Sequence, residues 1–267
     1  MSIITISRGS YSHSKKVAEK LAQKLGYECI SREVLLRASE KFNIMAIKVA
    51  QVIHRAPYIF DRITLGKEKY VAYMRAALLD EAQKDNIVYY DLAASHFLLQ
   101  GIPHVLKVNI IADMEDRVAE QVRRRDLSAE EARKKLHNDD EKLRKWSLHL
   151  YGVDFWDPIL YDLVIRIKPM TVDDAAELIS SVVKLPYYQT TPQSQEILRD
   201  LLLAAQVEAA FVEEFPGATV IAKEGKVLVE VEGYAADKKV TIDRIRQLAK
   251  EATGIVAEVR YQEDGWM

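Results

Sequence analysis

Residues 2–26 read S-I-I-T-I-S-R-G-S-Y-S-H-S-K-K-V-A-E-K-L-A-Q-K-L-G, and this stretch decides the fold. Ile3–Ser7 is a short β-branched run of the kind that forms a buried strand. A polar loop of small residues follows it. Apolar residues then recur at helical spacing from Lys15 to Leu25, which predicts a helix, and Gly26 fits a C-terminal stop.

The order of strand, small-residue loop and lysine at a helix start is typical of a phosphate-binding loop, in which helix amides face an anion. The usual pattern is G-x-x-x-x-G-K-[ST], and Gly9 and Lys15 match it at the right spacing. Ser14 stands where the second glycine belongs. Lys16 stands where a hydroxyl residue usually holds Mg²⁺, and an ammonium has no acceptor for a metal. An ordinary strand–helix turn, capped by Ser14 or Ser12, is the alternative.

The composition describes a chain that can build a real core. It has 267 residues, 49% of them hydrophobic, and a formal net charge of −2. That charge gives no case for binding nucleic acid. Cys29 is the only cysteine, so neither a disulfide framework nor a metal site is predicted. The N-terminus enters a strand without a secretory signal, and no apolar run reaches the ~20 residues needed to span a bilayer. We therefore expect a cytoplasmic protein without a transmembrane segment.

Strands and helices alternate over residues 1–185, which predicts an α/β domain with a parallel sheet and helices on both faces. The predicted strands after the first are Glu28–Ile30, Ile87–Leu92, Val105–Ile111 and Leu163–Ile167. The predicted helices after the first are Ser31–Lys41, Ala46–His54, Lys67–Asp85, Ala93–Gln100, Met114–Arg125, a helix from Ser128 to about Leu150, and Val172–Val183. The apolar residues of Lys67–Asp85 are expected to form one stripe, and the segment Ser128–Glu131 is expected to open its helix as a capping box.

Residues 186–192 are proline-flanked and lack periodicity, so they are predicted to be a linker. The chain after them, residues 193–267, reads as a small α+β domain of order αββαβ. Its predicted elements are Ser194–Phe215, the strands Ala218–Ala222 and Lys226–Glu232 joined by a tight glycine turn at Lys223-Glu224-Gly225, then Asp237–Thr253 and Val256–Tyr261. Alternation along the second of these strands predicts one packed and one largely solvated sheet face.

Several motifs in the first domain resemble the cytidylate-kinase-like family of P-loop nucleoside monophosphate kinases. The most specific are Gly152-Val153-Asp154-Phe155-Trp156-Asp157-Pro158 and Tyr161-Asp162-Leu163-Val164-Ile165. The opening strand, the stretches Asp85–Val88 and Pro103–Val108, and the segment 126–132 are also similar to that family. Residues 193–267 resemble, more weakly, the BON domain of bacterial envelope and sensor proteins.

The resemblance implies ATP-dependent phosphoryl transfer to a CMP- or dCMP-type nucleotide, with Mg²⁺ as cofactor. It implies catalytic roles for Lys15, Arg123 and Lys142. The residues it assigns to binding the nucleotide phosphates are Arg8, Gly9, Ser10, Tyr11, Ser12, His13, Ser14, Lys15 and Lys16.

The chain departs from the family pattern at two further catalytic positions. Asp91-Leu92-Ala93 stands where the family has Gly-Arg-Gly, whose arginine contacts a nucleotide phosphate. The family's lid carries Asp-x-x-Arg, but here Lys142 follows Asp140, and Arg144 comes one place beyond the expected arginine. Lys142 supplies charge without the bidentate fork of a guanidinium.

Two functions therefore stay open. The first is a working nucleotide kinase, and the second is an inactive kinase-fold scaffold that senses a ligand or binds a partner. Residues 193–267 are the expected surface for a protein partner or for self-association. Some local alternatives also stay open: a solvated turn position for His13, an exposed helix face for the run Asp139–Glu141, and surface ion pairs of Arg123–Arg125 with Asp126, Glu130 and Glu131.

Overall fold

The computed structural model describes residues 1–8, 13–31, 67–92, 99–125, 127–233 and 237–263. The predicted helices Ser31–Lys41 and Ala46–His54, most of Ala93–Gln100, and the loop residues Gly9, Ser10, Tyr11 and Ser12 lie outside the described residues. The chain forms two compact units. The first unit comprises Met1–Arg62 and Lys84–Thr190, and the second comprises Ile63–Gln83 and Thr191–Met267.

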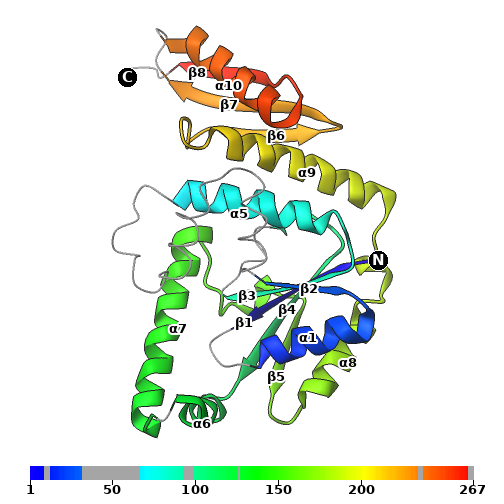
Figure 1. Ribbon diagram of the computed structural model, residues 1–267, viewed down its shortest axis with the longest axis vertical. Helices are drawn as coiled ribbons and strands as arrows, with labels where there is room; N and C mark the ends of the chain where they lie inside the picture. Colours follow the sequence, from blue (N-terminus) through cyan, green and yellow to red (C-terminus); the bar gives the residue numbers. More distant parts are fainter. Residues whose placement is uncertain (9–12, 32–66, 93–98, 126, 234–236, 264–267) are drawn as a thin grey trace. The chain divides into compact units, whose positions relative to one another are not determined.

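A five-stranded parallel sheet forms the centre of the first unit (Figure 1). Its strand order is β2-β3-β1-β4-β5. The strands are β1 (Ile3–Arg8), β2 (Glu28–Ser31), β3 (Ile87–Leu92), β4 (Val105–Ala112) and β5 (Leu163–Ile167). Because β1 pairs in parallel with both β3 and β4, the carboxyl ends of these three strands meet at one edge. The predicted parallel α/β fold of the P-loop type is confirmed.

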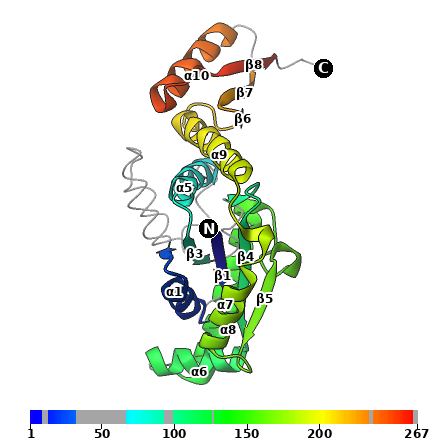
Figure 2. The same cartoon turned by 90° about the vertical axis from the view of Figure 1, so that its right-hand side faces the viewer.

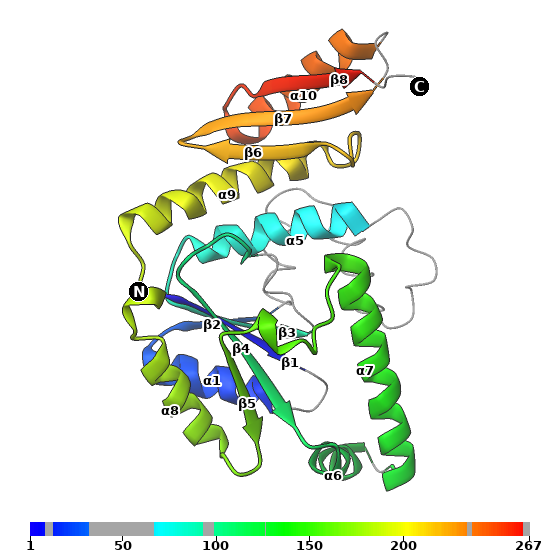
Figure 3. The ribbon, with the colours of Figure 1, turned by 180° about the vertical axis from the view of Figure 1, so that it is seen from behind.

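Two helices cover one face of this sheet. They are α1 (Ser14–Leu25) and α8 (Val172–Val182), which lie side by side (Figures 1 and 3). Apolar residues of both helices pack on β1, β3, β4 and β5 to form the main core. Exposed ion pairs of Lys20 with Asp173 (2.7 Å) and of Lys24 with Glu177 (2.5 Å) join the outer sides of the two helices.

Two further helices of the first unit follow β4. They are α6 (Met114–Arg125) and α7 (Ala129–Tyr151). The predicted capping box opens α7, since the Ser128 hydroxyl accepts the Glu131 N–H and the Glu131 carboxylate accepts the Ser128 N–H. A small apolar cluster of Val118, Ala132 and Leu136 packs α6 against α7. These two helices therefore form a hairpin with its own core.

The second unit contains a three-stranded sheet of order β6-β7-β8. Its strands are β6 (Thr219–Lys223), β7 (Lys226–Gly233) and β8 (Glu258–Glu263), and its helices are α9 (Pro192–Phe211) and α10 (Lys238–Thr253). Figure 2 shows α10 running along this sheet. Val227, Val229 and Val231 of β7 face a core with both helices, which confirms the predicted packed face.

Helix α5 (Lys67–Ala82) also belongs to the second unit, where it packs on α9. The Tyr73 hydroxyl donates to Glu213 (3.2 Å), Lys69 lies 3.6 Å from the same carboxylate, and Arg75 lies 3.9 Å from Glu208. Buried residues occur all around this helix rather than along one stripe. Helix α5 therefore comes before β3 in the sequence but belongs to the second unit.

Thr190 closes the first unit. Its backbone N–H donates to the Met1 carbonyl (2.8 Å), and its hydroxyl lies 2.5 Å from an Asp85 carboxylate oxygen. The division between the two units at residues 190 and 191 falls inside the predicted linker, residues 186–192. None of the helices in the described ranges is long and apolar enough to cross a membrane.

Candidate functional site

The start of α1 lies after the carboxyl end of β1, where the sequence predicts the phosphate loop. His13 is the N-cap residue and has a left-handed backbone, with φ 66°. Ser14 is buried as the first residue of the helix, and the first helical hydrogen bond runs from the Val17 N–H to the His13 carbonyl (3.1 Å). The residue with the left-handed backbone is therefore His13. Ser14 has a helical backbone, so its Cβ causes no strain of the kind that a positive φ brings. The His13 side chain makes no capping hydrogen bond.

Lys15 and Lys16 occupy the first turn of α1, and that turn has no acidic residue. The amide dipoles make a helix N-terminus positive, so each cation there costs the isolated helix about 0.3–1 kcal/mol. Lys15 is 64% exposed, and its only short contact in the described part of the chain is a 3.7 Å ion pair with Glu19, one turn along. An anion at this end of the helix would offset the unfavourable charge arrangement.

A buried polar group lies at the carboxyl ends of β1, β3 and β4. Ser7 is register-matched to Asp91 on one neighbouring strand and to Asn109 on the other, so the three side chains share one face of the sheet. All three residues are buried. The Tyr89 hydroxyl donates to an Asp91 carboxylate oxygen (3.0 Å). Polar oxygen atoms are therefore concentrated directly beside the strand end that leads into the loop.

Tyr161, the first residue of the Tyr-Asp motif, is tied to this group. Its hydroxyl lies 3.2 Å from Ser7 Oγ and 2.9 Å from the Phe155 carbonyl oxygen. Burial raises the pKa of Tyr161 to about 12, and the nearby Asp154 charge adds to the rise while the Ser7 hydrogen bond opposes it. Tyr161 therefore stays a neutral hydroxyl that connects the end of β1 to the segment before β5.

The aspartates of the same two motifs hold backbone in place. Asp157 accepts the Ile159 N–H (3.0 Å) at the start of a short 3-10 helix, η3 (Pro158–Leu160). Asp162 accepts the Lys107 N–H (2.8 Å). Asp154 accepts the Trp156 N–H (3.1 Å) and binds the Arg144 guanidinium (2.7 Å) on α7. The two motifs that most specifically resemble the family therefore hold in place the backbone next to the polar group of Ser7, Asp91 and Asn109.

Helix α6 carries two arginines that share one acidic partner. Glu120 binds both Arg123, through a short ion pair, and Arg124, whose Nε lies 2.7 Å from the carboxylate. The charge of His13 is close enough to help lower the pKa of Glu120. Arg123, predicted to be catalytic, therefore has Glu120 as its acidic partner. The described contacts do not use the predicted alternative partners Glu130 and Glu131 for Arg123 or Arg124.

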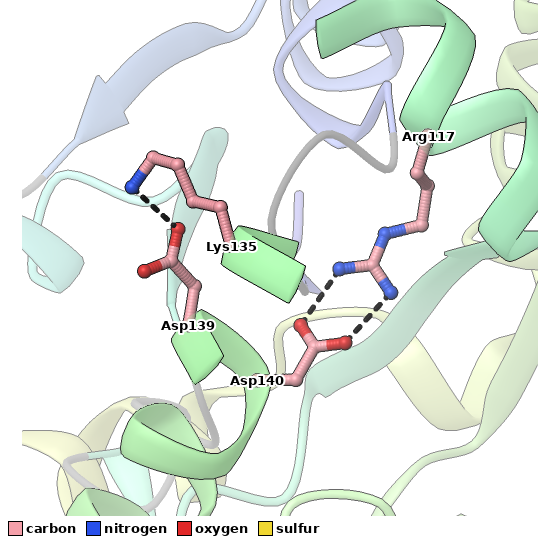
Figure 4. A network of polar contacts seen from close by, with 4 residues as sticks. All are labelled: Arg117, Lys135, Asp139 and Asp140. Carbon is pink, nitrogen blue, oxygen red and sulfur yellow. Dashed lines mark hydrogen bonds and ion pairs between the residues drawn. The ribbon is translucent and has the colours of Figure 1, made fainter. Parts of the chain in front are cut away.

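Asp139 and Asp140 are half-buried, and only Glu141 of this run is exposed, which corrects the expectation of an exposed acidic helix face. The Asp140 carboxylate makes a bidentate ion pair with Arg117 of α6, at 2.7 and 2.8 Å (Figure 4). The neighbouring Asp139 binds Lys135 of its own helix at 3.2 Å. Lys142 is half-buried on α7, two residues beyond Asp140. Its catalytic role stays a prediction, as does the phosphate-binding role of Arg8, which is the last residue of β1.

The sequence profile of the Cytidylate kinase-like family matches residues 3–169. The chain belongs to this family. A cytidylate kinase of Archaeoglobus fulgidus is 27% identical over 185 residues, which cover 68% of this chain and 94% of that protein. A cytidylate kinase of Pyrococcus furiosus is 23% identical, covering 68% of this chain and 88% of its own length.

Among solved structures, an uncharacterized protein from Eubacterium ventriosum is similar in fold to this cytidylate kinase-like chain. Its TM-score is 0.52 with 16% sequence identity, and the match covers 69% of this chain and 99% of that one. The family match ends at residue 169, so most of the second unit lies beyond it.

The family implies ATP and Mg²⁺, and the residues present fit a magnesium ion held largely by phosphate oxygens. Mg²⁺ usually takes one or two carboxylates together with phosphates and water. Asp91 and Ser7 offer oxygens beside the loop, whereas Lys16 offers none. Within the described residues, no group of three or more His, Cys, Asp or Glu side chains is arranged to hold a metal ion without such help.

Sequence reasoning missed Glu120, Arg117 and Tyr161 as parts of this site. The signal for Glu120 was present, since a glutamate three and four residues before two arginines favours helical ion pairs. Arg117 and Asp140 are 23 residues apart, and no periodicity joins them. The contact of Tyr161 with Ser7 spans 154 residues.

Proposed function

We propose that this chain binds ATP at the start of α1 and transfers its terminal phosphoryl group to CMP or dCMP. The observation that carries the proposal is the set of cations around the start of α1. Lys15 and Lys16 occupy the first turn of this helix beyond the carboxyl end of β1, and Arg123 and Arg124 of α6 are held by Glu120, on which the His13 charge at the same helix start also acts. The name of two relatives, cytidylate kinase, supports the choice of acceptor.

In this mechanism the chain contributes position and charge. The amides that open α1 bind the phosphates, and Lys15 reaches over them to the β- and γ-phosphates. Arg123 and Arg124 stabilise the charge that spreads over the transferring group. Asp91, with Ser7 beside it, holds Mg²⁺, which when bound neutralises charge on the phosphates. An arginine in such a role is worth ~10³–10⁵ in rate.

The test has a binding arm and a turnover arm. Calorimetric titration with ATP, with and without Mg²⁺, should detect binding that depends on the metal, and added CMP or dCMP should yield the diphosphate.

Lys15→Ala should abolish turnover. Lys20→Ala is the matched control, because Lys20 lies on the same helix but pairs with Asp173 of α8. Lys16→Thr restores the missing hydroxyl and should raise affinity for ATP in the presence of Mg²⁺. Absence of ATP binding at millimolar nucleotide would overturn the proposal.

A second candidate is a kinase-fold scaffold that binds a nucleotide without phosphorylating it. The observation in its favour is Asp91, a buried carboxylate at a position where an anionic substrate usually meets glycine and arginine. Repulsion between this carboxylate and an acceptor phosphate would leave ATP binding intact and suppress transfer. Binding without turnover on any nucleoside monophosphate would favour this candidate, and Asp91→Gly should then restore measurable transfer.

A further inference from the structure

Glu120 is a buried carboxylate between two exposed cations. The residue is 7% exposed, whereas the side chains of Arg123 and Arg124 are 70% and 53% exposed. Each carboxylate oxygen has its own arginine. Oε1 accepts from Arg124 Nε at 2.7 Å, and Oε2 accepts from Arg123 Nη2. The Glu120 carboxylate is therefore held inside the protein, and the guanidinium groups of Arg123 and Arg124 extend from it toward solvent.

This carboxylate is held in its charged form. Burial favours the neutral acid, but the hydrogen bond and charge of Arg124, the charge of Arg123 and the charge of His13 outweigh it, so the pKa of Glu120 is lowered. His13 is the N-cap of α1. Groups from α6 and from the start of the phosphate-binding helix thus act on one buried anion.

We propose that Glu120 is a positioning residue, which orients Arg123 and Arg124 toward the phosphates bound at the start of α1. This inference rests on the function proposed above. A guanidinium has five N–H donors in a rigid fork, and one carboxylate oxygen engages only part of it. The bond to Glu120 fixes the fork in direction and leaves donors to meet phosphate oxygens. An arginine without such an anchor must be ordered during the reaction instead.

The variant Glu120→Gln separates a positioning role from a general electrostatic role, because the two roles predict opposite effects on catalysis. Removing a negative charge beside the phosphate site favours binding of ATP, so the KM for ATP should stay the same or fall by up to about threefold. The loss of oriented arginines should lower kcat by roughly 10–100-fold, because it acts on the transition state. Glu120→Asp keeps the charge at a shorter reach and should recover part of kcat.

Glu115→Gln is the matched control. Glu115 lies on the same helix and pairs with an arginine, Arg133, at 2.7 Å, but its side chain is 67% exposed. Its loss should change kcat less than about twofold. A fall in kcat equal in both variants, or an unchanged kcat in Glu120→Gln, would overturn the inference.

A second readout does not depend on turnover. In nitrogen-15 NMR spectra, the Arg124 Nε–H bound to Glu120 should exchange slowly with water in the wild type and shift when MgATP is added. In Glu120→Gln it should exchange faster and lose that response. If MgATP binds and Lys15→Ala abolishes the binding, but Arg124 does not respond, this inference fails while the proposed function stands. If MgATP does not bind at all, both fail.

Discussion

Arg117 and Asp140 form a bidentate ion pair between α6 and α7, with N–O distances of 2.7 and 2.8 Å. Their side chains are only 6% and 13% exposed. Two buried charges cost a large desolvation free energy, which two parallel charge-assisted hydrogen bonds offset. The pair lies beside the apolar cluster of the same helix hairpin, and a second link joins Arg133 to Glu115 on its exposed side. The pair therefore fixes how the helix that carries Arg123 sits on α7.

Replacing one partner of this pair should be costly. Asp140→Ala removes the carboxylate that accepts two hydrogen bonds from the buried Arg117 guanidinium, so we expect the free energy of unfolding to fall by about 3–5 kcal/mol. Urea denaturation measures the loss. Asp139→Ala is the control, since its ion pair with Lys135 is half-exposed and should contribute less than about 1 kcal/mol. Equal losses in the two variants would show that burial does not decide the contribution of the pair.

The elements of the fold followed closely from local sequence. Ser128 and Glu131 predicted the capping box that opens α7, and Gly225 predicted the hairpin turn before β7. Helix α5 ends at Ala82 rather than at the predicted Asp85, because Asp85 has a left-handed backbone that a helix cannot continue. Local sequence did not predict that α5 packs on α9. Its predicted single apolar stripe is wrong, since buried residues surround the helix, and a helix without a polar face does not indicate its partner.

Buried His104 should make folding stability depend on pH. It is 1% exposed, and among the described residues neither ring nitrogen has a hydrogen-bond partner. Burial lowers the pKa of His104; the Asp85 charge opposes this, and the N-terminal amine adds to it. The unfolded chain therefore binds a proton more readily than the folded one. Stability is complete above about pH 6.5 and is lost as the pH falls below that value, by at most about 1.4 kcal/mol per pH unit.

The measurement is urea denaturation between pH 5 and pH 8. His104→Leu should flatten the decline at acid pH, because it removes the buried proton acceptor. His137→Gln, at an exposed position on α7, should keep the decline of the wild type. An unchanged pH dependence in His104→Leu would assign the acid sensitivity to other groups.

Truncation after Thr190 tests whether the second unit contributes to the thermal stability of the chain. It removes α9 and with it the partners of α5, including Glu208 and Glu213. We expect residues 1–190 to melt several degrees lower than the full chain or to become insoluble, because the apolar surface of α5 would be exposed. Thermal unfolding measures this. An unchanged melting temperature would instead favour a self-contained recognition module, as the sequence first suggested.

The candidate site was predicted unevenly, for a physical reason. Lys15 stands in the first turn of α1, where the spacing of a phosphate-binding loop puts it, and its role stays a prediction. Gly9 lies outside the described residues. The ion pairs of Glu120 with Arg123 and Arg124 also follow from helical spacing, but the contact of Tyr161 with Ser7 does not. Sequence spacing cannot indicate that Tyr161 meets Ser7, because that contact depends on how β5 and β1 are ordered around β4.

The turn between β6 and β7 offers a local test in the second unit. Glu224 and Gly225 both have left-handed backbones, with φ 50° and 72°, as a two-residue hairpin turn requires. Asp200 of α9 accepts both of their N–H groups, at 2.7 and 2.9 Å. Asp200→Ala should cost about 1–2 kcal/mol, because the bonds are charge-assisted but partly solvated. Hydrogen exchange at these two amides should accelerate together, and Asp243→Ala, at an exposed position on α10, should leave them unchanged. Unaltered protection in Asp200→Ala would mean that the strand pairing alone holds the turn.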